Sequence, residues 1–148
     1  MSLKDKINED LKAAMISGDK VRLETIRAIR SEVLKMDKSG MNREMTPEEE
    51  IDLLNKQAKQ RRESIDMFTQ ADRKDLVDKE QAQLDIISEY LPKQLTKEEA
   101  EEIINKIIAE TGATTAKDFG KVMGASSKAL KGMIDGKIVQ EIVKSKLS

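Results

Sequence analysis

Helical spacing of its apolar residues is the feature of this 148-residue chain that most restricts its fold. Apolar side chains recur every three or four positions in successive segments, which places them on one face of an α-helix. The first of these stripes consists of Leu3, Ile7, Leu11 and Met15. A charged fraction of 37% beside a hydrophobic fraction of 38%, with only two prolines, is typical of a soluble helical protein. We therefore predict an all-α fold.

Capping signals predict where the helices begin and end. Thr46 with Glu49 and Thr96 with Glu99 form two capping boxes, in which each side chain accepts from the other residue's backbone N–H. In chain order, the expected helix starts lie at Ser2, about Lys20, Thr46, Asp72, Thr96, Thr115 and Asp135. The expected ends lie near Ser17, Lys38, Tyr90 and Gly112.

Pro92 marks the predicted boundary between two parts of the chain. Proline disfavours α geometry at the preceding residue and has no N–H with which to continue a helix. We expect a helical N-terminal domain of about four helices over residues 1–91 and a small three-helix subdomain over residues 92–148.

The residue types that many enzymes use are missing. The chain contains no His and no Cys, which rules out the usual zinc sites, thiol nucleophiles and imidazole-based triads. It has neither a GxxxxGK[ST] phosphate loop nor a GxGxxG motif. The acidic clusters at 48–50 and around 98–102 open helices, where they offset the positive end of the helix dipole. We expect no catalytic residue, no metal site and no cofactor.

The expected location follows from the same kind of observation. No apolar run approaches the length of a bilayer span, and Met1 to Lys4 begin a polar helix rather than a signal peptide. The absence of cysteine is compatible with a reducing compartment. We expect a cytoplasmic protein with no membrane partner.

The stretch from Lys117 to Lys137 separates charge from apolar side chains. On an α-helix, Lys117, Lys121 and Lys128 fall within roughly 40° of one another. The opposite side carries Phe119, Val122, Met123 and Leu130. Gly120 and Gly124 lie beside the lysines, where a sugar-phosphate backbone or a second helix could approach closely. The alternative interpretation is a solvated lysine face with glycines for tight helix packing.

Charge is concentrated in the same region. Residues 112–148 hold seven lysines and three acidic residues, although the net charge of the whole chain is −1. Binding of nucleic acid rests mainly on Lys and Arg, so we expect weak binding by the protein alone. The aromatic residues Phe68, Tyr90 and Phe119 occupy packing positions, so any RNA contact should be to backbone and shape rather than by base stacking.

Three charged residues fall inside apolar stripes. Arg61 lies at the centre of the stripe of the third helix, and Glu80 and Arg30 lie within those of the fourth and second. An uncompensated charge there would be costly, so we predict a structural ion pair between Arg61 and Glu80, with Arg30 as the alternative cation; ligand recognition is the other interpretation. Lys56, Lys59 and Arg62 form a second cationic set on the third helix, which we interpret as solvated.

Several short motifs resemble one known family. In the last third of the chain they are FGKVMGA at 119–125, Lys131-Gly132, Asp135-Gly136 and Ile138-Val139. Earlier in the chain they are KQR at 59–61 with Glu63-Ser64 and Phe68, RKDL at 73–76, and Tyr90-Leu-Pro92 with Gln94-Leu95. In this order and spacing they resemble the GatB/YqeY family, which comprises the C-terminal tail domain of the B subunit of glutamine-dependent aminoacyl-tRNA amidotransferases and free-standing YqeY-like proteins.

The resemblance implies an accessory, tRNA-binding role in translation, related to the glutamine-dependent amidation of mischarged tRNA. The family-level activity is that of a carbon–nitrogen ligase with glutamine as amido donor, but this chain is expected to be non-catalytic. The implied partners are tRNA and an aminoacyl-tRNA synthetase or amidotransferase. The residues expected to contact the RNA backbone are Lys117, Lys121, Lys128, Lys131 and Lys137, with Gly120 and Gly124 permitting close approach.

A second class of function is a helical protein-interaction adaptor that docks on a synthetase or another RNA-handling protein. In this interpretation the tail only packs, and methionines such as Met41, Met45 and Met67 lie exposed on the docking surface.

Overall fold

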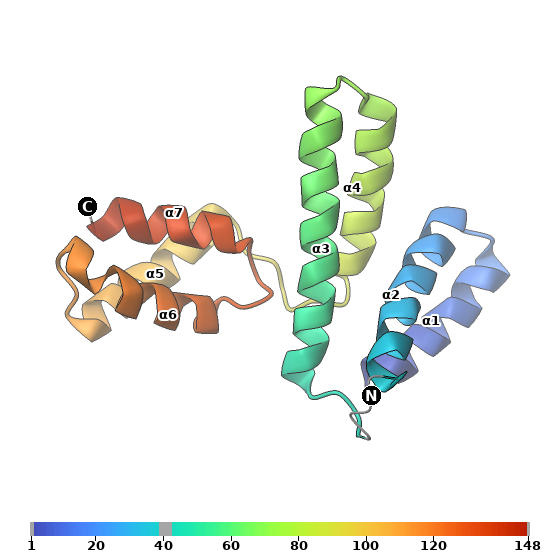
Figure 1. Ribbon diagram of the computed structural model, residues 1–148, viewed down its shortest axis with the longest axis horizontal. Coiled ribbons are helices and arrows are strands. Elements are labelled where there is room, and N and C mark those ends of the chain that lie inside the picture. The colour runs from blue at the N-terminus through green and yellow to red at the C-terminus, as the bar shows by residue number, and fades with distance from the viewer. Residues whose placement is uncertain (1, 39–42, 148) are drawn as a thin grey trace. The chain divides into compact units, whose positions relative to one another are not determined.

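The computed structural model describes residues 2–38 and 43–147. Within these residues the chain forms seven α-helices, one short 3-10 helix and no strand, which confirms the predicted all-α class (Figure 1). The chain divides into two compact units that meet at the Leu91–Pro92 bond. None of the described helices is both long and apolar enough to span a bilayer.

The first unit consists of two helical hairpins. Helices α1 (Leu3–Ser17) and α2 (Lys20–Lys38) form one hairpin, and α3 (Pro47–Gln70) and α4 (Lys74–Ser88) form the other, with α2 packed on both α3 and α4 (Figure 1). The buried core of this unit consists of Leu3, Ile7, Ala14, Ile26, Ile29, Val33, Leu54, Ala58, Ile87 and Leu91.

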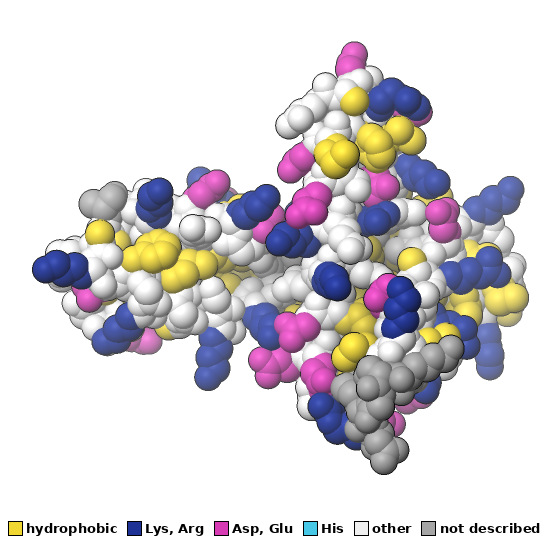
Figure 2. Space-filling model, viewed as in Figure 1, with side chains coloured by type: hydrophobic (Ala, Val, Ile, Leu, Met, Phe, Trp, Pro, Cys, Tyr) yellow, Lys and Arg dark blue, Asp and Glu magenta, His cyan; other side chains and the backbone are white. Residues whose placement is uncertain are grey.

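The far end of the second hairpin extends beyond this core. The buried core residues of α3 end at Ala58, while the helix continues to Gln70, roughly 18 Å further along its axis. The hydrophobic side chains of this part, here called the distal hairpin, are the exposed Met67 and the half-buried Ile65, Phe68, Leu76 and Val77. Figure 2 shows hydrophobic side chains gathered at this end of the α3–α4 hairpin.

The second unit packs three helices around a smaller core. These are α5 (Lys97–Thr111), α6 (Phe119–Ala129) and α7 (Gly136–Leu147), with the 3-10 helix η1 (Ala116–Asp118) directly before α6. The buried core of this unit consists of Ala100, Ile104, Ala113, Val122, Leu130, Val139, Ile142, Val143 and Leu147. The apolar side of α6 therefore faces inward, which leaves its polar side toward solvent.

The predicted caps hold at several helix starts. Ser2 caps α1, and both capping boxes are present, with Thr46 and Glu49 at α3 and with Thr96 and Glu99 at α5. Gly112 ends α5 with a φ of 69°, in the left-handed region that glycine adopts without steric cost.

Three local predictions were wrong. Asp72 does not cap α4, because it occupies the turn before that helix with a φ of 55°, and Arg73 holds the N-cap position without a side-chain hydrogen bond. Met15 does not belong to the core stripe, since it is 58% exposed near the end of α1. Met45 is half-buried against the core of the first unit rather than exposed. Met41 lies outside the described residues.

Candidate nucleic-acid interface

The stretch from Lys117 to Lys137 is not one helix but three short elements. Lys117 belongs to η1, Lys121 and Lys128 to α6, and Lys137 to the first turn of α7, while Lys131 lies in the turn between α6 and α7. Thr115 and Asp118 form a capping box on η1, whose tighter winding precedes the α-helix. The five predicted lysines therefore come from a continuous surface segment rather than from one helical stripe.

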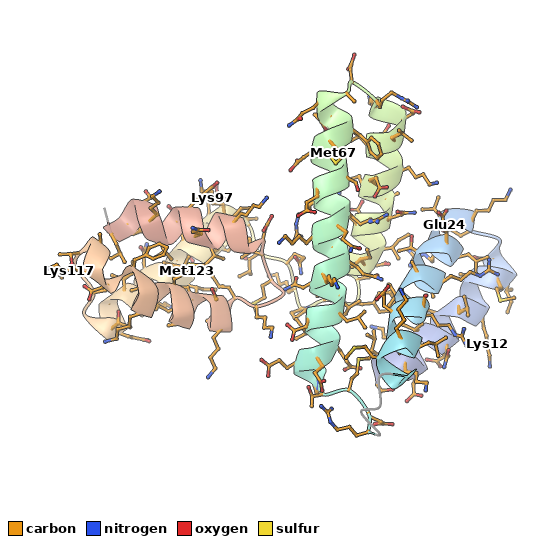
Figure 3. The ribbon with its side chains drawn as sticks, viewed as in Figure 1. Lys12, Glu24, Met67, Lys97, Lys117 and Met123 are labelled. Atoms are coloured by element: carbon orange, nitrogen blue, oxygen red, sulfur yellow. The ribbon has the colours of Figure 1, made fainter. Side chains whose placement is uncertain are left out.

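The lysines of α6 point away from the core. Lys117, Lys121 and Lys128 are exposed, whereas Val122 and Leu130 on the same segment are 0% and 1% exposed. Figure 3 labels Lys117 at the turn before α6, and Met123 of α6 packs against the core of the second unit. The surface formed by Lys117, Gly120, Lys121, Gly124 and Lys128 is here called the lysine face.

The two glycines of the lysine face have open space beside them. A Cβ atom added at Gly120 or at Gly124 would meet no atom of the described residues within 4 Å. Neither glycine has the positive φ that would require glycine. Glycine in a helix interior costs about 0.5–1 kcal/mol relative to alanine. Packing within the chain therefore does not account for these glycines, and the exposed backbone is open to a close approach from outside.

The remaining two lysines occupy different surroundings. Lys131 is half-buried, and Lys137 is exposed in the first turn of α7, where its N–H donates to Asp135 Oδ1 at 3.1 Å. A lysine near a helix N-terminus adds its charge to the positive end of the helix dipole. This position lowers helix stability slightly and raises the local positive potential.

Asp118 is the acidic residue closest in sequence to the exposed lysines of α6. Its carboxylate accepts from the backbone N–H groups of Thr114 at 3.0 Å and Thr115 at 3.4 Å. These hydrogen bonds, with a smaller contribution from Lys121, hold the pKa of Asp118 below its usual value. The side chain is thus engaged in the turn before η1.

Figure 2 shows the basic side chains of the second unit standing apart on the visible face, not as one continuous patch.

Two of the three charges predicted inside apolar stripes, Arg61 and Glu80, meet in the first unit. Arg61 Nη1 lies 3.0 Å from Glu80 Oε2, with the two side chains 30% and 16% exposed. The same Nη1 donates a hydrogen bond to Gln83 Oε1 at 2.9 Å, while Glu80 Oε2 has no hydrogen-bond partner. The contact is therefore an ion pair by distance, and the aligned hydrogen bond of Arg61 goes to the neighbouring amide.

Arg30 does not join this group, contrary to the alternative pairing. It is exposed on α2, and its Nε donates to Asn8 Oδ1 of α1 at 3.4 Å. The helix turns its side chain toward α1 rather than toward α3 and α4, so its position between apolar residues in the sequence did not mean burial.

Sequence reasoning missed the two buried glutamines beside Arg61. Gln57 and Gln83 are 9% and 7% exposed. Gln57 precedes Arg61 by four residues and Gln83 follows Glu80 by three, so both occupy the same helix faces as the ion pair. The pattern that singled out the charged residues would have found these amides had it been applied to every polar residue.

A second missed cluster fixes the end of α4. Tyr90 donates its hydroxyl to Asp10 Oδ2 of α1, with the two oxygens 2.5 Å apart, and Lys6 Nζ lies 5.2 Å from the centre of the Tyr90 ring. Burial and the hydrogen bond to Asp10 raise the pKa of Tyr90. Arg22 of α2 donates to both carboxylate oxygens of Glu89, at 2.7 and 3.4 Å.

The chain matches one family model and several known proteins over most of its length. A family model described as Yqey-like protein matches residues 4–147. A protein of Pyrenophora tritici-repentis named altered inheritance of mitochondria protein 41, mitochondrial, is 36% identical over 95% of this chain and 81% of its own length. A protein with the same name from Lachancea thermotolerans is 34% identical over 64% of this chain and 51% of its own length. Another from Eremothecium gossypii is 33% identical over 57% of this chain and 46% of its own length.

The expected cytoplasmic location is contradicted by these relatives, each of which is named as a mitochondrial protein. The expectation rested on the lack of cysteine, on the lack of a long apolar run and on the polar residues Met1 to Lys4. All three properties are equally compatible with the interior of a mitochondrion, so none of them could separate the two compartments. The match to the family model covers nearly the whole chain and agrees with the motifs found in the sequence, and the chain therefore belongs to the YqeY-like family.

Proposed function

We propose that the protein is a non-catalytic module that binds the backbone of tRNA through the lysine face, in a process related to glutamine-dependent amidation of mischarged aminoacyl-tRNA. The observation that carries this proposal is the pairing of exposed lysines with exposed helical glycines on α6. Charged groups attract phosphates, and bare backbone lets them come close.

The proposed contact is to phosphates rather than to bases. Lysine side chains on a rigid helix fix the position of a nucleic acid without reading its sequence. Phe119 is packed against the core of the second unit, so it does not serve as a stacking platform beside the lysines. The module would therefore recognise a shape that all tRNA molecules share, and a catalytic partner would supply the chemistry.

The test is a salt titration of tRNA binding with charge-reversed variants. Lys121→Glu and Lys128→Glu should each weaken the binding of every tRNA alike. Each should also flatten the dependence of log K on log salt by about one unit of slope, because each removes one phosphate contact. Neither should destabilise the fold appreciably, since both side chains point into solvent.

The matched control is Lys56→Glu, which reverses an exposed lysine on α3 in the other unit. An equal loss of affinity from Lys56→Glu and Lys121→Glu would indicate diffuse electrostatic attraction and would remove the lysine face from the proposal. Unchanged affinity in all three variants would leave no role for these lysines.

A second candidate function, a protein-interaction adaptor, is favoured by the distal hairpin. Met67 is 67% exposed, and the neighbouring apolar side chains lie beyond the buried core of the unit. An exposed methionine is an adaptable contact for a partner protein. In this case Met67→Asp should abolish a stable complex with a synthetase or amidotransferase while leaving tRNA affinity unchanged. A complex that survives Met67→Asp would favour the tRNA-binding module.

A further inference from the structure

The turn between α1 and α2 carries an exposed surface that the tRNA proposal does not use. Three large hydrophobic side chains are exposed among the described residues, and two of them, Met15 and Ile16, are consecutive in the last turn of α1. They are 58% and 88% exposed. A single apolar side chain on a surface is ordinary, but two adjacent ones at the end of a hairpin are a candidate contact with a partner.

Basic side chains surround Met15 and Ile16. Lys12 precedes them by three and four residues on α1, so it is a direct neighbour of both on the helix surface. Lys20 begins α2 directly after the turn, and Arg27 follows it by about two turns on the same side of that helix. Figure 2 shows hydrophobic and basic side chains gathered where α1 and α2 are joined, at the right of the view, and Figure 3 labels Lys12 on α1.

The packing of α1 against α2 brings these side chains onto one surface. Arg30 Nε of α2 donates to Asn8 Oδ1 of α1 at 3.4 Å, so these two residues lie at about the same level of the hairpin. In an antiparallel pair, Arg27 then lies level with Leu11, next to Lys12. The surface is here called the hairpin patch, and it consists of Lys12, Met15, Ile16, Lys20 and Arg27.

The three cations of the hairpin patch are uncompensated. Lys12, Lys20 and Arg27 are exposed, and none of them forms a hydrogen bond or an ion pair with any residue that the structure describes. Their charges are therefore available to an anionic partner.

Two of the three nearby carboxylates are already engaged. Asp19, in the turn, lies 3.8 Å from Arg22 Nε and accepts from the backbone N–H of Arg22 at 3.0 Å. Glu24 of α2 lies 3.8 Å from Lys79 of α4. Glu9 of α1 is the opposing charge that remains. The hairpin patch is thus cationic, although residues 1–91 hold more acidic than basic side chains.

We propose that the hairpin patch docks on the surface of an anionic phospholipid bilayer. Such a surface presents phosphate groups directly above hydrocarbon, so it offers partners to cations and to apolar side chains at the same place. Met15 and Ile16 enter the boundary between headgroups and acyl chains, while the long side chains of Lys12 and Lys20 keep their charges among the phosphates. The prediction of no membrane partner rested on the lack of a spanning run, which docking at the bilayer surface does not require.

A nucleic acid fits the hairpin patch less well. It would pair with the cations, but the patch has no aromatic side chain on which a base could stack. An isoleucine that stays exposed beside a phosphate gains nothing from the contact, whereas burial in a bilayer removes its apolar surface from water. The hairpin patch also lies wholly in the first unit and is independent of the lysine face.

The experiment is a flotation assay of the full chain with two kinds of vesicle, one of phosphatidylcholine alone and one of equal parts phosphatidylcholine and phosphatidylserine. The expected result is binding to the anionic vesicles alone, weakened by added salt. Ile16→Ser should weaken this binding at least about tenfold, because it removes most of the apolar surface of that side chain. Lys12→Gln and Lys20→Gln should each weaken it about fivefold. All three positions are exposed, so the fold should persist.

Two matched controls change the same residue types on another helix. Met67→Ser removes the exposed methionine of α3, and Lys59→Gln neutralises an exposed lysine of α3. Both should leave the affinity for anionic vesicles unchanged.

A single tryptophan tests whether the hairpin patch enters the bilayer. The chain contains no tryptophan, so Ile16→Trp introduces one fluorophore at the patch. Its emission should move to shorter wavelength when anionic vesicles are added, because the indole ring leaves water for the interface. The emission of Met67→Trp, the control, should not move.

Three results would overturn the proposal. One is the absence of binding to the anionic vesicles, or an emission of Ile16→Trp that they leave unchanged. Another is an equal loss of vesicle affinity in the patch variants and the control variants, which would indicate diffuse electrostatic attraction. The third is a loss of tRNA affinity in Lys12→Gln and Lys20→Gln with no change in vesicle binding, which would show that the hairpin patch binds RNA instead.

Discussion

The Arg61–Glu80 pair combines properties of a surface and a buried ion pair. Glu80 is 16% exposed and Arg61 is 30% exposed, so the carboxylate has lost more water than the guanidinium has. Because of this desolvation, removing one partner lowers the free energy of unfolding by more than the net stabilisation that the intact pair provides. The charge on Arg61 then depends on Glu80 for compensation and on Gln83 for a hydrogen bond.

We expect Glu80→Ala to lower the free energy of unfolding by about 1–3 kcal/mol, between the values typical of exposed and of fully buried pairs. Denaturant unfolding followed by circular dichroism measures this. The matched control is Arg73→Ala, which removes an ion pair with Asp75 whose side chains are 55% and 65% exposed. That change should leave the free energy of unfolding almost unchanged, because solvent screens an exposed pair. Equal losses from the two variants would show that burial of Glu80 contributes nothing to the effect.

At the level of single residues, the sequence predicted burial reliably where the apolar spacing within one helix determines which side chains face the core. Val122 and Leu130 were predicted to face inward, and both are buried. It was unreliable for Arg30 and Met15, because a stripe on one helix does not state how far the neighbouring helix extends to cover it. The relevant information lies in the packing of α1 against α2, which no short window of sequence contains.

Capping boxes make the starts of α3 and α5 sensitive to pH. Glu49 accepts from the backbone N–H of Thr46 at 3.0 Å and from Arg43 Nη1 at 2.6 Å. The hydrogen bonds from Arg43 and Thr46 lower the pKa of Glu49 to about 2. A carboxylate with a lowered pKa stabilises the folded state above its unfolded pKa and loses that contribution as the pH falls toward its folded pKa.

Glu49→Gln should therefore lower the melting temperature at pH 7, and the difference from the parent protein should shrink as the pH falls from about 5 to about 2. Thermal unfolding at several pH values measures this. Glu98→Gln, which changes an exposed residue of the first turn of α5, is the control and should give a small difference. A Glu49→Gln difference that stays constant over this range would contradict the role of the charged carboxylate.

Helix α6 allows packing and binding to be separated by substitution. Gly124→Ala should raise the free energy of unfolding by about 0.5–1 kcal/mol, because alanine favours the helix and its Cβ would meet no atom of the residues that the structure describes. Gly124→Leu should also leave the fold intact but should weaken tRNA binding by blocking the approach of the backbone. Calorimetry and tRNA titration on the same samples measure both effects. Destabilisation by Gly124→Ala would show that the glycine serves packing.

At the level of helices, the sequence predicted the number and order of the helices better than the places where a helix is interrupted. All seven α-helices correspond to expected segments, because caps and apolar stripes are local signals. The break at η1 and the left-handed turn residue Asp72 were missed. The hydrogen bonds at both places are local: Asp118 accepts from Thr114 and Thr115 before η1, and Asp72 donates its N–H to the carbonyl oxygen of Thr69. The apolar spacing on which the predictions rested carries no information about these turns.

For the whole molecule, the charge distribution restricts the strength of any RNA contact. The net charge of the chain is −1, and the basic excess is confined to residues 112–148. Electrostatic attraction by the protein alone is therefore modest, and tight binding would need a partner that adds further phosphate contacts. Sequence composition predicted this balance directly, since net charge does not depend on the fold.

The purified protein, given glutamine, ATP, magnesium and mischarged tRNA, should release no glutamate and form no amide. The chain contains no His or Cys nucleophile system and no nucleotide-binding motif. Chromatographic detection of glutamate and of the amidated aminoacyl group measures the two products. Adding the catalytic subunits of an amidotransferase is the positive control. Robust turnover by the pure chain would contradict the proposed accessory role.

Two hydrogen bonds join the first residues of the second unit to the loop after α6. Leu95 donates its N–H to the carbonyl oxygen of Met133 at 2.8 Å, and Gln94 Nε2 donates to the carbonyl oxygen of Gly132 at 2.6 Å. A pull on the chain at Pro92 is therefore transmitted to the loop after α6 before it reaches any helix. Tension on the linker would load two hydrogen bonds beside Lys131 first, so in a force experiment that loop should yield before the core of the unit does.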